Sequence, residues 1–418
     1  MKTKRIINTV ISAVLLIVFA ANIAGCTARV KAGNLMDDIV PGETKPVVYN
    51  FGDSSKKAAD FAVRLLKATN AEGENTLVSP LSVMCALAMT ANGAKGETLS
   101  QMETVLGMSK DELNEFFMQY LAKLVNGEKY KLNMANSIWF TSDPRFTVNK
   151  DFLQANADHF GADIYRAPFD DSTLYDINNW VKKKTDGMIP EILDQIPQEA
   201  VMYLINALAF DAEWAEIYKK SEVFTGKFTL EDGTVRDTDY MSSIEDLYLD
   251  SGSATGFIKY YSGGKYAFAA LLPKEGMTVS ELVASLNGDD LLKLLSTPIE
   301  TSVSVMLPKF ETGFDIELSE VLESMGMPDA FDQRKADFTA LGTSALGNIW
   351  ISRVLHKTFI SVDEKGTKAG AATVVEAVDE CAAVSFVSVD LNRPFVYMLI
   401  DCETNLPFFI GTMMDISK

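Results

Sequence analysis

Four continuous apolar runs after residue 200 most constrain the fold of the chain. They are rich in β-forming residues and are bounded by Gly, Pro or charged residues: VMYLINALAF from Val201, YAFAALLP from Tyr266, VSVMLPKF from Val303 and RPFVYMLI from Arg393. A strand that is apolar on both faces has to be covered on both faces. We therefore expect large buried sheets to dominate the chain after about residue 200.

The first third of the chain shows helical periodicity instead. Apolar residues recur every three or four positions at Lys56 to Ala68, Pro80 to Asn92 and Asp111 to Val125. We find no internal repeat, and no linker composition after residue 50. With 418 residues and 47% hydrophobic content, one mixed α+β domain over residues 51–418 is the simplest prediction.

The N-terminus has the pattern of an export signal. Lys2, Lys4 and Arg5 precede an apolar run that ends at IAGC, where Cys26 follows small residues. This ending resembles a bacterial lipobox and predicts a lipoprotein signal peptide over residues 1–25, with Cys26 lipidated. The alternatives are an ordinary signal peptide and a short membrane anchor, in both of which the cysteine would be incidental. Residues 26–50, with Pro and Gly and little apolar periodicity, are expected to be a flexible tether. We expect a secreted protein, lipid-anchored at a bacterial cell envelope and facing outward.

Composition excludes several classes of function. A net charge of −19 argues against nucleic-acid binding, because phosphate recognition needs concentrated Lys and Arg. Four cysteines and two histidines offer no disulfide framework and no His-rich metal centre. HExxH, GxSxG and the phosphate-binding GxxxxGK[ST] pattern are absent. We expect neither catalysis nor a cofactor.

Successive blocks of sequence resemble the serpins, the superfamily of serine protease inhibitors. The similarity runs from about residue 50 to the C-terminus and is carried by NTLVSPLSVMCALAMTANGAKGETLSQM from Asn75, INNWVKKKTDGMI from Ile177, LINALAFDAEW from Leu204, LPKF from Leu307, MGMPDAFDQRKADF from Met325 and VLHKTFISVDEKGTKAGAAT from Val354. The resemblance implies three β-sheets, about nine helices and an exposed reactive loop near the C-terminus. It implies a suicide-substrate inhibitor that forms a covalent acyl-enzyme with a serine protease and inserts its cut loop into the main sheet.

The loop sequence is compatible with insertion as a strand. Counting alternately from Thr367, one face carries Thr, Ala and Val only, whereas Lys368 and Glu376 fall on the other face. A charge on the buried face would cost several kcal/mol unless it were paired. Gly366 and the small residues after it, Thr367, Lys368, Ala369, Gly370, Ala371, Ala372 and Thr373, form the predicted hinge and insertion segment, which can enter a sheet without large rearrangements.

The reactive bond follows from the resemblance. Serpins are usually cut seventeen residues into the segment that begins at the hinge glutamate, here Glu364, which predicts cleavage between Glu380 and Cys381. This count slips by a residue or so within the family, which makes the Cys381–Ala382 and Ala382–Ala383 bonds the alternatives. Glu380 suits a protease with a basic specificity pocket, whereas Cys381 or Ala382 suits an elastase-like enzyme. No Arg or Lys lies near the bond, so a trypsin-like target is not expected.

The resemblance also assigns two clusters that control opening of the sheet. Ser79, Ser82, Asn206 and His356 correspond to the shutter, a buried polar cluster beneath the central strands. Trp214, Lys309 and Glu364 correspond to the breach, where the loop first enters. A serine and His356 could also form a nucleophile and base, but a buried hydrogen-bonded network is the better interpretation.

Two other functions stay open at this point. One is a non-inhibitory serpin that acts as a carrier or binding protein; such proteins commonly carry bulky or charged hinge residues, unlike Thr367, Ala369 and Ala371. The other is a hydrolase, which the missing motifs oppose. Lysines near the predicted fourth helix, such as Lys123 and Lys129, are sparse, so we expect no heparin-type cofactor, and we expect a monomer.

Overall fold

The computed structural model describes residues 31–42, 51–124, 126–196, 200–345, 347–367 and 387–417. Over these residues the chain forms nine α-helices: α2 (Ser54–Thr69), α3 (Pro80–Ala91), α4 (Gly96–Leu106), α5 (Lys110–Lys123), α6 (Lys150–Phe160), α7 (Asp171–Lys184), α8 (Val279–Ser285), α9 (Gly288–Ser296) and α10 (Ser319–Met325). The three helices predicted in the first third of the chain are confirmed as α2, α3 and α5, with ends that differ by up to two residues.

The strands within the described residues form three sheets. The first has seven strands in the spatial order β1 (Gly33–Asn34), β5 (Asp163–Ala167), β3 (Tyr130–Thr141), β6 (Met202–Glu213), β15 (Gly366–Thr367), β14 (Arg353–Val362) and β12 (Phe310–Glu317). The second has nine: β16 (Val387–Asp390), β11 (Ile299–Pro308), β8 (Val235–Asp250), β9 (Ala254–Tyr260), β10 (Tyr266–Pro273), β17 (Phe395–Asp401), β18 (Leu406–Met413) and β2 (Thr76–Val78), with β7 (Val223–Thr229) beside β8. The third pairs β13 (Gly342–Ser344) with β4 (Phe146–Val148). The predicted α+β class is confirmed.

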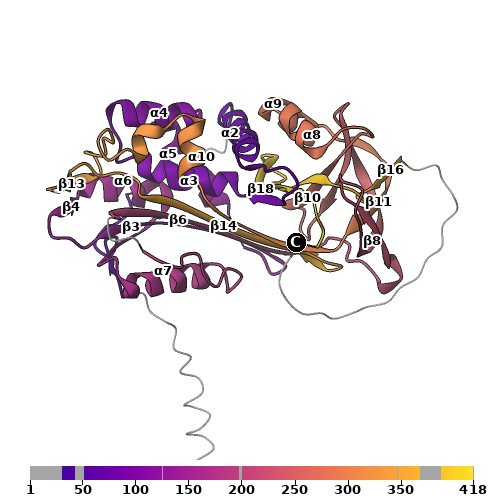
Figure 1. The fold of residues 1–418 in the computed structure, drawn as a ribbon, viewed down its shortest axis with the longest axis horizontal. Helices are drawn as coiled ribbons and strands as arrows, with labels where there is room; N and C mark the ends of the chain where they lie inside the picture. The colour runs from indigo at the N-terminus through magenta and orange to yellow at the C-terminus, as the bar shows by residue number, and fades with distance from the viewer. Residues whose placement is uncertain are drawn as a thin grey trace, which may run out of the picture. The chain divides into compact units, whose positions relative to one another are not determined.

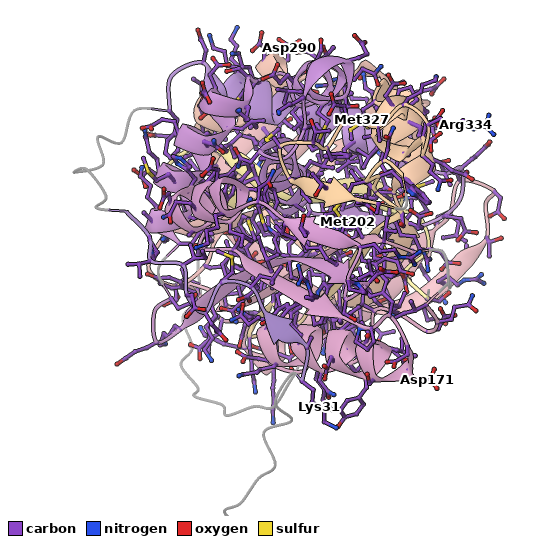
Figure 2. The ribbon with its side chains drawn as sticks, turned by 90° about the vertical axis from the view of Figure 1, so that its left-hand side faces the viewer. Lys31, Asp171, Met202, Asp290, Met327 and Arg334 are labelled. Atoms are coloured by element: carbon purple, nitrogen blue, oxygen red, sulfur yellow. The ribbon has the colours of Figure 1, made fainter. Side chains whose placement is uncertain are left out.

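Helices cover both faces of the seven-stranded sheet. Figure 1 shows α7 on one side of β3, β6 and β14, and α3 with α5 on the other. In Figure 2, Met202 at the start of β6 lies between Asp171, at the start of α7, and Met327 on the opposite side. Because the sheet is covered on both faces, β6 is buried from Met202 to Phe210, as its apolar run predicted.

The helices begin where the local sequence favours it. Pro80 stands in the first turn of α3, and all residues of this helix are buried. Ser109 and Glu112 form a capping box at the start of α5, and the Asp170 carboxylate accepts hydrogen bonds from Ser172 N and Thr173 N at the start of α7. These caps satisfy amide groups that would otherwise lack partners at the helix ends.

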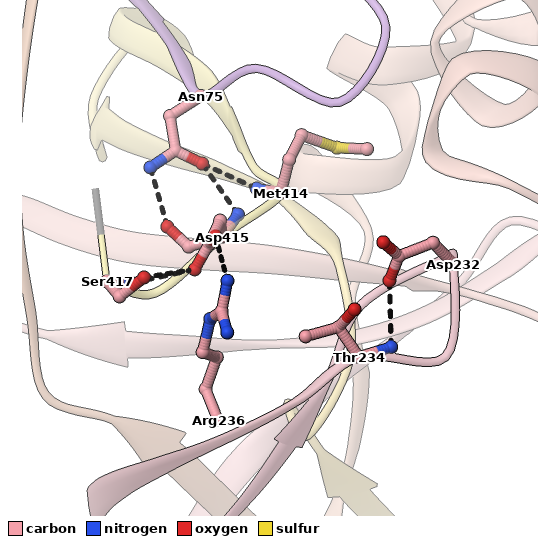
Figure 3. A network of polar contacts seen from close by, with 7 residues as sticks. All are labelled: Asn75, Asp232, Thr234, Arg236, Met414, Asp415 and Ser417. Atoms are coloured by element: carbon pink, nitrogen blue, oxygen red, sulfur yellow. Dashed lines mark hydrogen bonds and ion pairs between the residues drawn. The ribbon is translucent and has the colours of Figure 1, made fainter.

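Asn75 holds the C-terminal strand in place (Figure 3). Its side-chain oxygen accepts hydrogen bonds from Met414 N (2.7 Å) and Asp415 N (2.9 Å), and its amide donates to Asp415 O (2.8 Å). Arg236 adds an ion pair of 3.4 Å to the Asp415 carboxylate. The end of β18 is therefore fixed beside β2, the strand that leads into α3.

The prediction of a flexible tether over residues 26–50 is wrong for residues 32–42. Gly33 and Asn34 pair with β5 as an edge strand, and Ala32 N donates to the Asp176 carboxylate over 2.7 Å. Gly42 N donates to Asp158 at 2.7 Å, and this part belongs to the same compact unit as the rest of the domain, Ala32–Lys418. Backbone pairing needs no apolar periodicity, which is why the composition did not indicate it.

Candidate functional site

The predicted hinge lies inside the seven-stranded sheet. Thr367 pairs antiparallel with Ala212 of β6 on one side and with Val362 of β14 on the other. The side chain of Thr367 is 1% exposed, on the face that the sequence alternation assigns to the core. The first two residues of the hinge therefore already form a short strand between β6 and β14.

Gly366 is required by close packing of two backbones. A Cβ atom at this position would lie 1.9 Å from the carbonyl oxygen of Ala212, far inside van der Waals contact. Gly366 is buried, and its backbone pairs with Glu213. The glycine thus allows the hinge to lie directly against β6.

Next to the hinge the seven-stranded sheet is parted, which means that β6 and β14 are not paired with each other there. β6 and β14 pair directly over Tyr203–Ala207 and Arg353–Lys357, and no ladder joins residues 208–211 to residues 358–361 within the described part of the chain. Thr367 fills the far end of this gap. The two strands therefore diverge toward the hinge, and the next residues of the chain could enter between them.

The three predicted breach residues surround the turn that precedes the hinge. Lys309 Nζ and Glu364 Oε2 form an ion pair of 2.8 Å, and this contact lowers the pKa of the Glu364 carboxyl group. Trp214 Nε1 donates to Asp363 O over 2.8 Å, and Trp214 N donates to Lys365 O over 2.7 Å. Both side chains of the ion pair are about one third exposed (31% and 37%), so we expect the pair to orient the turn more than to stabilise the fold.

The four predicted shutter residues also lie together, where the sheet is closed. His356 of β14 stands opposite Asn206 of β6. His356 Nδ1 lies 2.6 Å from Asn206 Oδ1, and Asn206 Nδ2 donates to Ser82 Oγ over 2.5 Å. Ser79 takes part through its backbone, because Ser79 N donates to His356 Nε2 over 3.0 Å.

Asn136 is a fifth member that the sequence analysis missed. It lies on β3 directly opposite Asn206, and its Oδ1 accepts from Asn206 Nδ2 over 2.6 Å. Asn136, Asn206 and His356 thus stand in register across three neighbouring strands. A polar residue within the apolar strand sequence MANSIWF was the available signal, parallel to Asn206 in LINALAF.

The hydrogen bonds fix the protonation of His356. Nε2 accepts from Ser79 N, so the proton of the neutral ring is on Nδ1, where it is donated to Asn206 Oδ1. Burial lowers the pKa of His356 to about 3. Neither serine hydroxyl bonds to the imidazole, and both ring nitrogens are occupied, so this cluster lacks the serine–histidine contact of a nucleophilic site.

Several predicted site residues lie outside the described residues. They are the reactive-bond residues Glu380, Cys381 and Ala382, the insertion residues Lys368, Ala369, Gly370, Ala371, Ala372 and Thr373, and Cys26 at the lipobox. Among the described residues, no group of three or more His, Cys, Asp or Glu side chains could hold a metal ion. No helix in the described segments is long and apolar enough to cross a membrane.

The arrangement defines a class of protein. A large sheet is parted at one end, a buried hinge strand is seated in the gap, and a polar cluster ties the strands together where the gap closes. Such a sheet can accept a further strand from its own chain.

Comparison with known proteins identifies the family. The model for "Serpin (serine protease inhibitor)" matches residues 56–416, and the chain belongs to this family. Serpin B10 of Bos taurus is 30% identical over 396 residues, covering 85% of this chain and 98% of the relative. Tengpin, a thermophilic serpin, is 49% identical in its native-state crystal structure, with a TM-score of 0.87 and coverage of 92% of this chain and 100% of tengpin. In its latent state tengpin gives 48% identity and a TM-score of 0.78, covering 90% of this chain and 100% of tengpin.

Proposed function

We propose that this serpin is a suicide-substrate inhibitor of a serine endopeptidase. The protease serine attacks the reactive bond and forms an acyl-enzyme, and the cut loop then enters the sheet between β6 and β14 and carries the protease away before the ester hydrolyses. The observation that carries the proposal is the parted sheet, in which Gly366 and Thr367 are already paired as the start of the new strand. Family membership alone would not distinguish an inhibitor from a carrier.

The sequence around the reactive bond suggests the class of target. We propose cleavage at Glu380–Cys381 or one residue later, by an elastase-like protease with a small apolar pocket or by a glutamate-specific protease. Small-pocket enzymes are favoured because they form the wider class. A trypsin-like pocket would need Arg or Lys at this bond, and neither is there.

Mixing the protein with an elastase-like and with a glutamate-specific protease should yield a covalent complex that survives SDS and boiling. The variant Thr367→Arg should be cut at the same bond without trapping the protease, because a guanidinium group cannot be buried unpaired beside Ala212 and Val362. Ala372→Arg places the same side chain on the outward face of the inserted strand and serves as the matched control, which should still form the complex.

Two results would contradict the proposal. Cleavage of the wild-type loop by both proteases without any stable complex would favour the non-inhibitory alternative, a carrier or binding protein. Undiminished trapping by Thr367→Arg would show that entry of the hinge into the sheet is not needed.

We further propose that the protein acts at a bacterial cell surface, held by a lipid at Cys26. The charged and apolar residues before Cys26 and the small residues in IAGC support this location. In cells fed labelled palmitate, the wild-type protein should carry label and sediment with membranes. Cys26→Ser should lose the label and leave the membrane fraction, and label retained by this variant would contradict the assignment.

A further inference from the structure

A hydroxyl group buried beneath the hinge holds Thr367 in place. Tyr261, which follows β9, has 0% exposure, and its hydroxyl oxygen lies 2.5 Å from Thr367 Oγ1. No other hydrogen-bond partner of this hydroxyl is found among the described residues. If Thr367 left the sheet, the Tyr261 hydroxyl would stay buried without a partner, and a buried unpaired hydroxyl is costly.

The ring of Tyr261 is fixed by Trp214. The two rings stack with their centroids 4.5 Å apart and an angle of 7° between their planes. The backbones of the two residues also pair as an isolated β-bridge. Since Trp214 in turn binds the carbonyl groups of Asp363 and Lys365, one aromatic stack holds both the turn before the hinge and the hinge itself.

The buried ammonium group of Lys259 lies close to this aromatic stack. Lys259 of β9 is 3% exposed, and its Nζ lies 4.5 Å from the ring centroid of Tyr218 and 5.5 Å from that of Trp214. Its counter-ion is Glu245 of β8, at 2.8 Å. An ammonium group over aromatic faces is attracted to them, more strongly where water is excluded.

The other contacts of Glu245 connect this ion pair, through Ser243 and Tyr218, to the turn that precedes the hinge. Its carboxylate also accepts a hydrogen bond of 2.6 Å from Ser243, whose oxygen lies 3.2 Å from the Tyr218 hydroxyl. Tyr218 N donates to Glu364 O over 2.9 Å. A buried ion pair is weak evidence of stability but fixes geometry well, because either partner left alone would be an uncompensated charge.

We propose that Tyr261 is a positioning residue for trapping: its hydroxyl keeps Thr367 seated in the sheet, so that insertion starts from a strand end already formed, and the Lys259–Glu245 ion pair holds the Trp214–Tyr261 stack in place. This inference rests on the proposed inhibitory function. It assigns roles to Tyr261, Lys259 and Glu245, which lie outside the predicted breach and shutter.

The test compares variants that remove the hydrogen bond from either side. Tyr261→Phe and Thr367→Val each delete one hydroxyl and keep most of the side-chain volume. Thr367→Ser keeps the hydroxyl and is the matched control. We expect each deletion to speed hydrogen exchange of the Gly366 and Thr367 amides about tenfold, and to raise the number of inhibitor molecules cut per protease trapped. The double variant should be no worse than either single variant, and Thr367→Ser should behave as wild type.

Wild-type hinge exchange in Tyr261→Phe, or additive effects in the double variant, would overturn the proposal. The exchange measurement needs no protease, so it decides the role of Tyr261 even if the wild-type protein forms no complex and the inhibitory function fails.

For the ion pair, Lys259→Met alone would leave a buried carboxylate and could prevent folding. The double variant Lys259→Met/Glu245→Gln removes both charges. It should also speed hinge exchange, and unchanged exchange would refute the supporting role of the pair.

Discussion

Cutting the loop near Cys381 without trapping a protease should raise the midpoint of thermal unfolding by on the order of 10 to 20 °C. The expected gain in stability comes from the gap between β6 and β14. Within the described residues no ladder joins 208–211 to 358–361, although Leu208, Phe210 and Ile360 are buried. Backbone groups that lack partners in such surroundings are costly, and a strand entering the gap would supply the partners.

The size of the effect follows from the length of the inserted segment. About a dozen new ladder hydrogen bonds at roughly 0.5 to 1.5 kcal/mol each, with burial of the Thr, Ala and Val face, give on the order of 10 kcal/mol. Ordering the inserted residues offsets part of this gain. The remainder is still comparable to the stability of a whole domain, so the uncut protein would be metastable.

The measurement needs a protease that cuts the loop but forms no acyl-enzyme, such as a metalloprotease. Calorimetry before and after the cut gives the shift in the midpoint. Thr367→Arg, cut at the same bond, is the control and should gain little, because its hinge cannot enter the sheet. A wild-type midpoint that does not rise after cutting would mean that no energy is stored in the parted sheet, and the trapping mechanism would then lack its driving force.

The regular elements of this fold were largely predictable from sequence. The apolar runs from Val201, Tyr266 and Arg393 became strands that are buried on both faces, and such strands need little beyond continuous hydrophobicity. The run from Val303 became part of β11, in which Val303, Val305 and Leu307 are buried and the residues between them are partly exposed. The shutter and breach residues were assigned by family resemblance alone, since nothing in the spacing of Ser82, Asn206 and His356 brings them together. Their contact depends on the register of β6 against β14.

Other features depend on pairing between distant segments and left no local pattern. The edge strand at Gly33–Asn34 is two residues long, too short for any periodicity. The hydrogen bond that holds Thr367 in the sheet comes from Tyr261, 106 residues earlier in the chain. A tyrosine beside a strand gives no signal of this contact in the sequence. Asn136 stands out as a polar residue in MANSIWF, but its contact with Asn206 depends on the register of β3 against β6.

Acid should weaken the shutter through His356. Burial lowers the pKa of this imidazole from 6.5 to about 3, so the unfolded chain binds a proton between these values that the folded protein does not. Stability is therefore complete above pH 6.5 and is lost as the pH falls toward 3. The slope approaches 1.4 kcal/mol per pH unit, about 2 to 3 kcal/mol between pH 6.5 and 4.5. Protonation of Nε2 would also break the bond from Ser79 N.

The histidine can be isolated by comparing variants in this window. In His356→Gln the amide oxygen can accept from Ser79 N and the NH₂ group can donate to Asn206, without any titration. Asp401, whose pKa burial raises, favours the folded state on acidification and is common to both proteins, so the difference between them reports His356. Urea unfolding at a series of pH values should show that the free energy of unfolding of the wild type declines as the pH falls. The control variant His159→Gln, which removes the other histidine, should show the same decline, and His356→Gln should lack it. Equal pH dependence in His356→Gln and wild type would mean that His356 does not couple the shutter to protonation.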